Sequence, residues 1–591
     1  MDLLDYLILL AYLSFLSFLG LFVRKTAASS LQSYFLANHK LSWIYLAMSG
    51  SVSNFDIAGT MFITSLLFLL GMKSMWVHMM WGVFMGAFFM AYMGRWVRSS
   101  QVLTPAEWMR FRFGNGNGGK LAQLSYAIMA IVTLTASIGY AFQGVGKFAS
   151  VYLPFSPSTC ALFIMGFTTF YASLGGFRAV VFSDVIQTVI LSISAIIISG
   201  IAWYSLEPAQ NYLDLSWASL IPPFTTDVPG FELFGLLVLA WGIKGILLNL
   251  GGPGQMYDFQ RFLATKNPAE AAKTGAAWSL FLIVRWPMCM GIALLALNGI
   301  EQGIQDPEKV MPLVFSQYLP SGIRGFVLTG FFAAFMSTFS SVVNSGASFL
   351  VKDIWQEHFA PSASNQQLIK ASYAASFIIV LAGVTSGLFA ESITQIWNWI
   401  MMALGSGVIV PNVLRWYWWR MNGWGYSAGL LSGMISAFYG LYTSQLNTHE
   451  LFLICTVSSS FTSIMVSYLT PPVDLKTLVK FYQSVRPFGA WKEVRARMPE
   501  QTMTAPETFP LSIFNVCLGI IVITGLYIGP MYFVGQWYEM SLLFISLSIC
   551  ASVILYFTWY QKIVQVWEFY SDETNQSATS RLYAERLSDF T

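Results

Sequence analysis

Long apolar stretches recur along the whole chain, and they constrain its fold more than any other feature. The stretch TVILSISAIIISGIAWYSL, residues 188–206, contains no charged residue and as a helix is long enough to cross a hydrocarbon core of about 30 Å. Of the 591 residues, 56% are hydrophobic and only 10% are charged, which is unlike a water-soluble chain. We therefore predict an all-α polytopic membrane protein with about fifteen transmembrane helices, over the approximate residue ranges 3–23, 43–71, 75–95, 121–150, 157–173, 180–204, 232–252, 272–299, 322–352, 370–389, 393–418, 426–444, 449–468, 511–533 and 541–560.

The Lys and Arg residues orient these helices, because short cytoplasmic loops retain positive charge. If the N-terminus lies outside, most of the 31 Lys and Arg residues fall on the cytoplasmic side, and only Lys73, Lys309 and Arg324 fall in outer loops. The first apolar segment has no basic residue before it, so we interpret it as a retained helix rather than a signal peptide. We expect an integral protein of the plasma (cytoplasmic) membrane, surrounded by lipid, with its C-terminus in the cytoplasm.

Other classes of protein are not favoured. The four His residues are scattered, and no paired carboxylates or Ser/His pair suggest catalysis, so we do not expect an enzyme. The five Cys residues all fall inside predicted helices and have neither disulfide nor zinc spacing. The net charge of +3 reflects membrane orientation, and we see no nucleic-acid signature. The run LRWYWWR, residues 414–420, is typical of an aromatic and basic anchor at the membrane interface.

Four ionisable side chains fall within or at the ends of the apolar segments, namely Asp56, Asp184, Lys244 and Arg285. A charge at membrane depth costs a few kcal/mol, so each is a functional candidate. Two host segments also look discontinuous as helices, at SGSVSN (49–54) and NLGGPG (249–254). Interrupted helices expose backbone carbonyls that can coordinate an ion or a solute. The breaks fall on the second and seventh predicted helices, which is the spacing of a five-plus-five inverted repeat.

The ninth predicted helix carries a stripe of small polar residues. At about 100° per residue, one side of this helix presents Ala334, Ser337, Thr338, Ser341, Ser345 and Ser348, with Ser340 and Asn344 at its edge. A sodium ion takes oxygen ligands, and the Ala334 carbonyl with the Ser337 and Thr338 hydroxyls offers three of them. Small residues of this kind also let membrane helices pack closely. Beside a broken helix and a buried Asp, we favour the ion site.

Several motifs occur in order along the chain, namely SNFDIAGTMF, LTPAEWMRFRFG, YASLGGFRAVVFSDVIQ, QRFLATKNPAEA, and AAFMSTFSSVVNS followed by VKDIW. In this ordered set, residues 3–468 resemble the sodium:solute symporter family, which includes the sodium/glucose, proline, pantothenate and sialic acid symporters. The resemblance implies the leucine-transporter fold, whose core is a five-plus-five inverted repeat with broken core helices one and six. Core helix one would be residues 43–71.

The resemblance also implies positions for Na⁺, the coupling ion. The matching residues of the main sodium site, which would contribute backbone carbonyls or hydroxyls, are Val52, Phe55, Ala334, Ser337 and Thr338. Some members have a second sodium site, and its matching residues are Asp184, Ser337, Ser340 and Ser341. One or two sodium ions are therefore expected. The alternative for Asp184 is a helix N-terminal residue stabilised by the helix dipole.

The solute is less constrained, because the chain departs from the sugar-binding pattern of the family. Gly59 stands where the sugar branch has Gln or His, and Gly252 stands where it has a stacking Tyr. Polar residues that remain near the expected cavity are Asn54, Asp56, Asn249, Arg285, Gln395 and Asn398. Arg285 suits either capture of a solute carboxylate or a buried ion pair with Asp56, and the sequence leaves both open. Lys244 either reaches the cavity or is a packing lysine paired elsewhere, and we favour the second interpretation.

These inferences divide the chain into seven parts: 1–42, an extra N-terminal transmembrane helix and cytoplasmic link; 43–204, the first inverted repeat; 205–419, the second inverted repeat; 420–468, two peripheral helices; 469–510, a cytoplasmic basic loop; 511–560, two C-terminal peripheral helices; and 561–591, a cytoplasmic tail. We expect a sodium-coupled secondary active symporter that imports a small polar organic solute by alternating access. The solute would be sugar-like, a sugar acid or another organic anion. The alternatives are a solute sensor built on the same fold and an uncoupled carrier.

Overall fold

The chain folds into helices, and no β-strand forms in the part that the structure describes. In a computed structural model, that part comprises residues 1–27, 36–39, 41–81, 83–252, 257–299, 304, 306–390, 392–443, 447–498 and 508–563. The α-helices are α1 (Leu3–Ala27), α3 (Trp43–Ser53), α4 (Ile57–Leu70), α5 (Met85–Phe88), α6 (Gly94–Ser99), α7 (Glu107–Phe113), α8 (Asn117–Ala149), α9 (Pro157–Ser205), α10 (Leu215–Ala218), α11 (Phe234–Leu250), α12 (Asp258–Leu263), α13 (Pro268–Phe281), α14 (Arg285–Gly299), α15 (Val310–Tyr318), α16 (Ile323–Ser348), α17 (Asn365–Leu388), α18 (Ile393–Asn398), α19 (Gly405–Tyr417), α20 (Gly423–Thr443), α21 (Thr448–Leu469), α22 (Leu475–Val485), α23 (Lys492–Arg495), α24 (Phe509–Val534) and α25 (Tyr538–Leu555).

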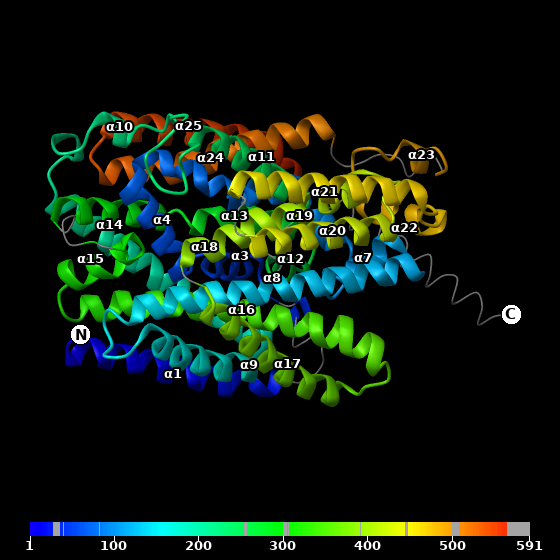
Figure 1. Ribbon diagram of the computed structural model, residues 1–591, viewed down its shortest axis with the longest axis horizontal. Coiled ribbons are helices and arrows are strands. Elements are labelled where there is room, and N and C mark those ends of the chain that lie inside the picture. The colour runs from blue at the N-terminus through cyan, green and yellow to red at the C-terminus, as the bar shows by residue number, and fades with distance from the viewer. Residues whose placement is uncertain are drawn as a thin grey trace.

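The longer helices run mostly along one direction (Figure 1). The N-terminus lies at the same end of the bundle as α15 and α10, whereas α7, α22 and α23 lie at the opposite end. The helices α24 and α25 lie on one side of the bundle, and α1 lies on the other. The loops that connect the long helices therefore lie at the two ends of the bundle, as expected for a chain that crosses a membrane repeatedly.

Ten helical segments among the described residues are long and apolar enough to cross a membrane. They are Ile57–His78, Asn117–Ala149, Val180–Ser205, Pro268–Gly299, Ile323–Phe359, Asn365–Leu388, Ile393–Tyr417, His449–Leu469, Phe509–Val534 and Tyr538–Ile563. Three shorter apolar helices are Leu3–Leu16, Pro157–Phe170 and Phe234–Leu250. An all-α membrane protein is thus confirmed, while the total of about fifteen crossings stays a prediction.

The helix α9 takes in two stretches that the sequence predicts as separate helices, 157–173 and 180–204. It is helical throughout from Pro157 to Ser205, so the expected interruption between these stretches is not seen. Small residues let neighbouring helices approach it closely. Pro157 lies against Gly146 of α8, and Ala202 lies against Gly291 of α14.

The chain leaves helical geometry at Asn54, Phe55 and Asp56, between α3 and α4. Asp56 caps the second helix, because its carboxylate accepts a hydrogen bond from the Gly59 N–H at 2.9 Å. The first helix approaches α13 through Gly50, where a Cβ would lie 2.0 Å from the Trp278 ring, so only glycine fits. The other expected break falls between α11 and α12, and residues 253–256 within it lie outside the described part.

The helix α16 lies in the middle of the bundle and packs against α1, α3, α8 and α9. Nearly all of its side chains are buried, including the predicted stripe of small polar residues except Thr338, which is partly buried. These residues permit close packing, as at Gly330, where a Cβ would lie 2.9 Å from the Ser194 hydroxyl of α9. The stripe is therefore placed inside the protein rather than against lipid.

The loop 469–510 packs onto one end of the bundle through an aromatic cluster. The Arg112 guanidinium of α7 lies 5.1 Å from the Phe481 ring and 4.8 Å from the Trp491 ring. Its Nε donates to the Arg415 carbonyl at 2.8 Å. Arg415 is only 2% exposed and Trp416 is 0% exposed, so the prediction of an interfacial anchor at 414–420 is wrong for these two residues. Trp416 lies against Phe481 of α22 and its carbonyl accepts from the Trp491 indole, whereas Arg415 lies against the Trp108 and Tyr126 rings.

The two C-terminal helices are fixed to the rest of the bundle by tyrosine and tryptophan hydrogen bonds. The Tyr527 hydroxyl of α24 donates to the Ser279 carbonyl of α13 at 3.1 Å. The Tyr532 hydroxyl donates to the Ala218 carbonyl of α10 at 2.7 Å. Beyond α25, the Trp559 indole donates to the Met90 carbonyl at 2.8 Å. The two C-terminal helices are therefore packed firmly against the bundle, and at each contact a buried tyrosine hydroxyl or tryptophan N–H has a carbonyl acceptor.

Candidate functional site

The helix α16 meets the break between α3 and α4 at Thr338. The Thr338 hydroxyl donates to the Ser53 carbonyl at 2.7 Å and lies 3.2 Å from the Ala334 carbonyl of its own helix. On the other side, the Val52 carbonyl accepts from the Phe55 N–H at 2.9 Å. Backbone carbonyls at a helix end and a hydroxyl of a crossing helix thus converge at one place. Uncharged oxygens of this kind can replace the hydration shell of a small cation.

Ser337 lies one residue before this contact and points its hydroxyl into the protein. It is buried, and its Oγ has no hydrogen-bond partner among the described residues. An unsatisfied buried hydroxyl costs free energy, which a bound cation would offset. Val52, Phe55 and Ala334 are buried around the same point. The described residues also contain no cluster of His, Cys, Asp and Glu that would suit a transition metal.

A second group of polar side chains lies around Asp184, where four helices meet. The Asp184 carboxylate accepts a hydrogen bond from Ser49 of α3 and lies 3.5 Å from the Arg261 Nη2 of α12. The same Nη2 donates to the Ser341 hydroxyl of α16 at 2.8 Å, and the Arg261 Nε donates to Ser49 at 3.0 Å. Asp258 adds a second carboxylate 4.0 Å from the guanidinium. All five side chains are buried.

This geometry differs in part from the second sodium site that the resemblance implies. Asp184 and Ser341 do lie near each other, but the Arg261 guanidinium contacts both of them. Ser340 donates to the Ser337 carbonyl within its own helix at 3.1 Å. The carboxylate also lies near Ser337, so the two predicted sodium sites share an edge of α16. In this structure the positive charge beside Asp184 and Ser341 is therefore the Arg261 guanidinium.

Arg285, the first residue of α14, faces the break between α3 and α4. Its Nη1 donates to the Asn54 carbonyl at 2.6 Å, and its Nη2 lies 3.5 Å from the Asp56 Oδ1. The guanidinium lies 5.2 Å from the Phe55 ring. The ion pair between Arg285 and Asp56, one of the two interpretations that the sequence leaves open, is thus formed in the structure. The pair places one charge of each sign beside the broken helix.

The remaining predicted solute contacts lie at different distances from this pair. Gln395 and Asn398 belong to α18, whose Trp397 ring packs 5.0 Å from the Tyr140 ring. Tyr140 also lies beside Asp56, so the Tyr140 ring stands between Trp397 of α18 and the Asp56 carboxylate. Asn249 is buried in α11 and donates to the Gly245 carbonyl of its own helix at 2.8 Å. Arg285 is in direct contact with both Asn54 and Asp56.

Two further basic residues, Lys244 and Arg261, are buried in the structure. Lys244 is buried with its Nζ 3.6 Å from the Met401 sulfur, which fits its interpretation as a packing residue. Arg261 was assigned by its charge to the cytoplasmic side, yet it is buried at the Asp184 cluster. Its position inside the motif QRFLATKNPAEA was the signal that could have identified it. Ser49 and the Ser53 carbonyl belong to the glycine- and serine-rich break but were not singled out.

The chain matches the description of one protein family over most of its length. The model of the sodium:solute symporter family matches residues 34–435. Among curated proteins, the high-affinity proline transporter PutP of Bacillus subtilis is 25% identical over 441 residues, covering 70% of this chain and 87% of that protein. The sodium/glucose cotransporter of Vibrio parahaemolyticus is 22% identical over 475 residues, covering 74% of this chain and 84% of that protein.

A solved structure supports the fold. The chain is similar to a Na⁺-coupled sialic acid symporter in a substrate-bound outward-open state, with a TM-score of 0.64 and 16% sequence identity. The alignment covers 80% of this chain and 99% of that symporter. At this level of identity the likeness concerns the arrangement of helices, and it shows that the two chains share a fold.

Proposed function

Because this chain belongs to the sodium:solute symporter family, we propose that it is a sodium-coupled secondary active symporter that imports a small polar organic solute by alternating access. The observation that carries the proposal is the contact between Thr338 and the Ser53 carbonyl, next to the buried and unsatisfied Ser337 hydroxyl. It joins a broken helix to a crossing helix, and a cation bound there would hold the two together. Closure and opening of that contact would couple sodium to the solute.

The coupling sodium binds at the main site, with oxygen ligands from Val52, Phe55, Ala334, Ser337 and Thr338. The donor set fits, because it consists of neutral carbonyl and hydroxyl oxygens on two helices that meet at the break. In the five-plus-five inverted repeat, α3 with α4 forms core helix one and α11 with α12 forms core helix six. The described chain leaves helical geometry at Asn54, Phe55 and Asp56 in the first pair and at Gly251 and Gly252 in the second, and breaks of this kind lie near the bilayer midplane in many transporters.

A second sodium at Asp184, Ser337, Ser340 and Ser341 would have to share the cluster with the Arg261 guanidinium. Two like unit charges about 4 Å apart repel by about 4 kcal/mol at an effective dielectric constant of 20. The guanidinium therefore acts as a built-in competitor of the second ion. A second sodium is bound only in a conformation in which Arg261 moves away from Asp184, so the number of coupled ions depends on this residue.

The solute binds beside the break, where Asn54, Asp56 and Arg285 lie. A sugar-like solute, a sugar acid or another organic anion remains the proposed class. Since Asp56 already neutralises Arg285, a lone anion would compete with that carboxylate for the guanidinium. A solute that carries both a carboxylate and a hydrogen-bond donor for Asp56 fits the pair better. Gln395 and Asn398 on α18 and Asn249 on α11 would reach such a solute only after these helices move.

A thermal-shift screen tests the proposal. The purified protein is unfolded in sodium or potassium buffer with sugars, sugar acids, amino acids and other small polar solutes. A ligand that binds the folded state adds about 2.7 kcal/mol of stability at 100 times its Kd. We expect at least one solute to raise the Tm in sodium but not in potassium. A shift that is indifferent to sodium would favour the alternatives, a sensor or an uncoupled carrier.

Variants of α16 assign that shift to the main site. Ser337→Ala and Thr338→Ala each remove an oxygen ligand, so we expect both to lose the sodium-dependent shift. Thr329→Ala is the matched control, because its hydroxyl only donates to the Gly325 carbonyl of the same helix at 2.8 Å. If Ser337→Ala and Thr338→Ala retain the sodium dependence of the wild type, the main site is not at these residues.

A further inference from the structure

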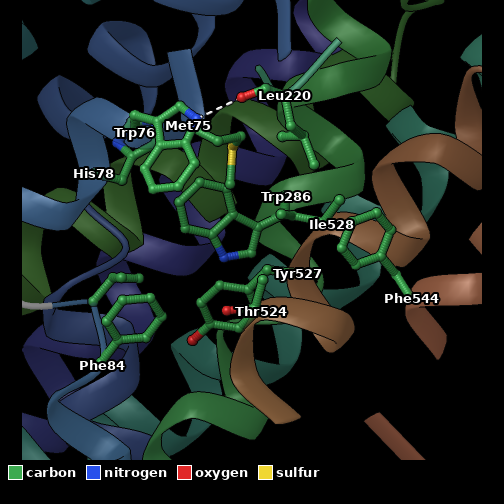
Figure 2. Close-up of a pocket in the computed structure, with 11 residues that line it drawn as sticks. Met75, Trp76, His78, Phe84, Leu220, Trp286, Thr524, Tyr527, Ile528 and Phe544 are labelled. Atoms are coloured by element: carbon green, nitrogen blue, oxygen red, sulfur yellow. Dashed lines mark hydrogen bonds between the residues drawn. The ribbon is translucent and has the colours of Figure 1, made fainter. Parts of the chain in front are cut away.

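An apolar cavity lies between the transport core and the two C-terminal helices, and Trp286 in its wall directly follows Arg285 of the proposed solute site. Its volume is about 260 Å³. Figure 2 shows the side chains around it, which come from the 3₁₀-helix η2 (Gly71–Trp81), the start of α14, the C-terminal helices and the loop after α10. The residues that the argument uses are Trp76, His78, Trp286, Thr524, Tyr527 and Phe544.

The size and lining of the cavity suit an apolar molecule. A dry cavity of about 150 Å³ binds benzene, so this one has room for a larger hydrocarbon group. Rings form most of the wall: the Trp286 ring stacks on the Tyr527 ring at 5.0 Å and meets the His78 ring edge-on at 5.1 Å. Among the described residues, no Asp, Glu, Lys or Arg side chain lines the cavity. A charged or strongly polar solute would lose its hydration here without compensation.

One hydrogen-bond donor in the wall is left without an acceptor. The Trp286 side chain is 4% exposed, and its indole N–H has no hydrogen-bond partner among the described residues. The Trp76 indole and the Tyr527 hydroxyl are used elsewhere, since Trp76 donates to the Leu220 carbonyl at 2.6 Å (Figure 2) and Tyr527 donates to the Ser279 carbonyl. A molecule with a single acceptor oxygen would satisfy the Trp286 donor.

The lipid-facing surface next to Phe544 indicates where such a molecule comes from. Along α25, the neighbouring residues Leu542 and Leu543 are 67% and 50% exposed, as expected for side chains in contact with acyl chains. Phe544 itself is partly buried and forms the wall of the cavity on that side. A lipophilic molecule dissolved in the bilayer is therefore concentrated at this wall and can enter without crossing water.

We propose that this cavity binds a lipophilic molecule from the membrane, with a hydrocarbon body and one acceptor oxygen that takes the Trp286 N–H. The ligand fills the gap between α14 of the transport core and α24, so it joins the C-terminal helices to the core. The site differs from the solute site in chemistry, since it has no charged group. The two ligands also reach the protein from different phases, because the ligand of the cavity partitions into lipid rather than water.

Photolabelling of the full-length protein tests this proposal. The probe is an octanol that carries a photoactivatable diazirine, applied in nanodiscs and followed by mass spectrometry of the labelled peptides. We expect label on the peptides that contain Trp286 and Thr524, and its loss when unlabelled octanol competes. Trp286→Phe keeps a ring but removes the N–H, so it should weaken labelling by the octanol and leave labelling by the corresponding diazirine alkane unchanged.

Two filling variants and one control make the result specific. Thr524→Phe and Val83→Phe each add a ring to the wall and should abolish the label, whereas Leu543→Phe makes a change of similar kind on the lipid-facing surface and should retain it. Label that appears only around Leu543, or that survives both filling variants, would overturn the proposal. So would competition by the sodium-dependent solute. The labelling needs neither sodium nor solute, so its failure is distinct from failure of the proposed symport.

Discussion

Arg261 shows how a single residue can change the expected chemistry of a site. The sequence indicates a cluster of Asp184 with serines of α16, which on its own would suit a second sodium. In the structure, the guanidinium donates to Ser341 and lies 3.5 Å from Asp184, so the cluster already contains a positive charge. Charge alone did not predict this, because a basic residue beyond a helix end is usually cytoplasmic. Its burial follows from the packing of α12 against α3, which is a tertiary contact.

We predict that Asp184→Asn and Arg261→Gln each destabilise the protein, because each leaves a buried charge without one of its partners. Breaking a buried ion pair by removing one side costs about 3–5 kcal/mol. The double variant should be less stable than Asp184→Asn alone, because it also leaves the buried Asp258 carboxylate without the Arg261 guanidinium. Thermal unfolding of the three variants in sodium-free buffer measures the effect. Single variants as stable as the wild type would show that the pair contributes nothing.

If Asp184 binds the proposed second sodium ion, its carboxylate also sets how far the solute can be concentrated. One sodium ion that moves through about 100 mV gains about 2.3 kcal/mol, and a tenfold gradient adds about 1.4 kcal/mol. One ion therefore supports a solute ratio of order 10²–10³ and two ions about 10⁵. Asp184→Asn should lower the sodium:solute ratio without abolishing transport, as measured by paired sodium and solute fluxes in proteoliposomes. A wild-type ratio of one would exclude the second sodium.

At the scale of elements, periodicity predicted more than charge did. The spacing of small polar residues on α16 correctly indicates one face, and that face meets the break at Thr338. The sequence predicts the break at SGSVSN, residues 49–54, whereas the structure keeps residues 49–53 in α3 and leaves helical geometry at Asn54, Phe55 and Asp56. The continuous course of α9 could not, because glycines at 175 and 176 look like a turn in sequence. The pairing of Arg285 with Asp56 was one of two open interpretations, and only the distance between them decides which is formed.

Glu308 joins three elements at the end of the bundle where the N-terminus lies. Its carboxylate accepts from the Lys147 Nζ of α8 at 2.5 Å and from the N–H and hydroxyl of Thr394 in α18 at 3.0 and 2.8 Å. Burial raises the pKa of Glu308, but these hydrogen bonds and the Lys147 charge lower it more, so the pKa lies below its usual value of 4.5. The ionised carboxylate therefore stabilises this end of the fold.

We predict that Glu308→Gln destabilises the protein at neutral pH by about 1.5–3 kcal/mol, the contribution of hydrogen bonds to a charged group. Because the folded pKa is depressed, this stabilisation is present above pH 4.5 and is lost as the pH falls through the folded pKa. The difference in Tm between variant and wild type should therefore shrink as the pH is lowered below 4.5. Asp306→Asn is the control, since Asp306 is 37% exposed and 3.6 Å from Lys147. A pH-independent difference would contradict the assignment.

At the scale of the whole molecule, the apolar segments were sufficient to predict the membrane class but not the docking of the loop 469–510. Its residues Phe481 and Trp491 stack on each other at 5.4 Å, and nothing in their sequence spacing indicates that they also enclose Arg112 and Trp416. The C-terminal pair α24 and α25 was likewise predicted as helices but without a role. Its contacts with α10 and α13 come from tyrosines whose carbonyl acceptors cannot be identified from sequence spacing.

The distribution of Lys and Arg predicts the orientation of the molecule in the membrane, and this prediction can be tested at two exposed positions outside the predicted crossings. Asp227 lies in the loop between α9 and α11, and Lys476 lies in α22, with seven predicted crossings between them. With exposed Cys517 and Cys550 replaced by Ser, we expect a membrane-impermeant maleimide to label Asp227→Cys in intact cells. Lys476→Cys should be labelled only after permeabilisation. The reverse pattern would invert the topology, and labelling of both from one side would require an even number of crossings between them.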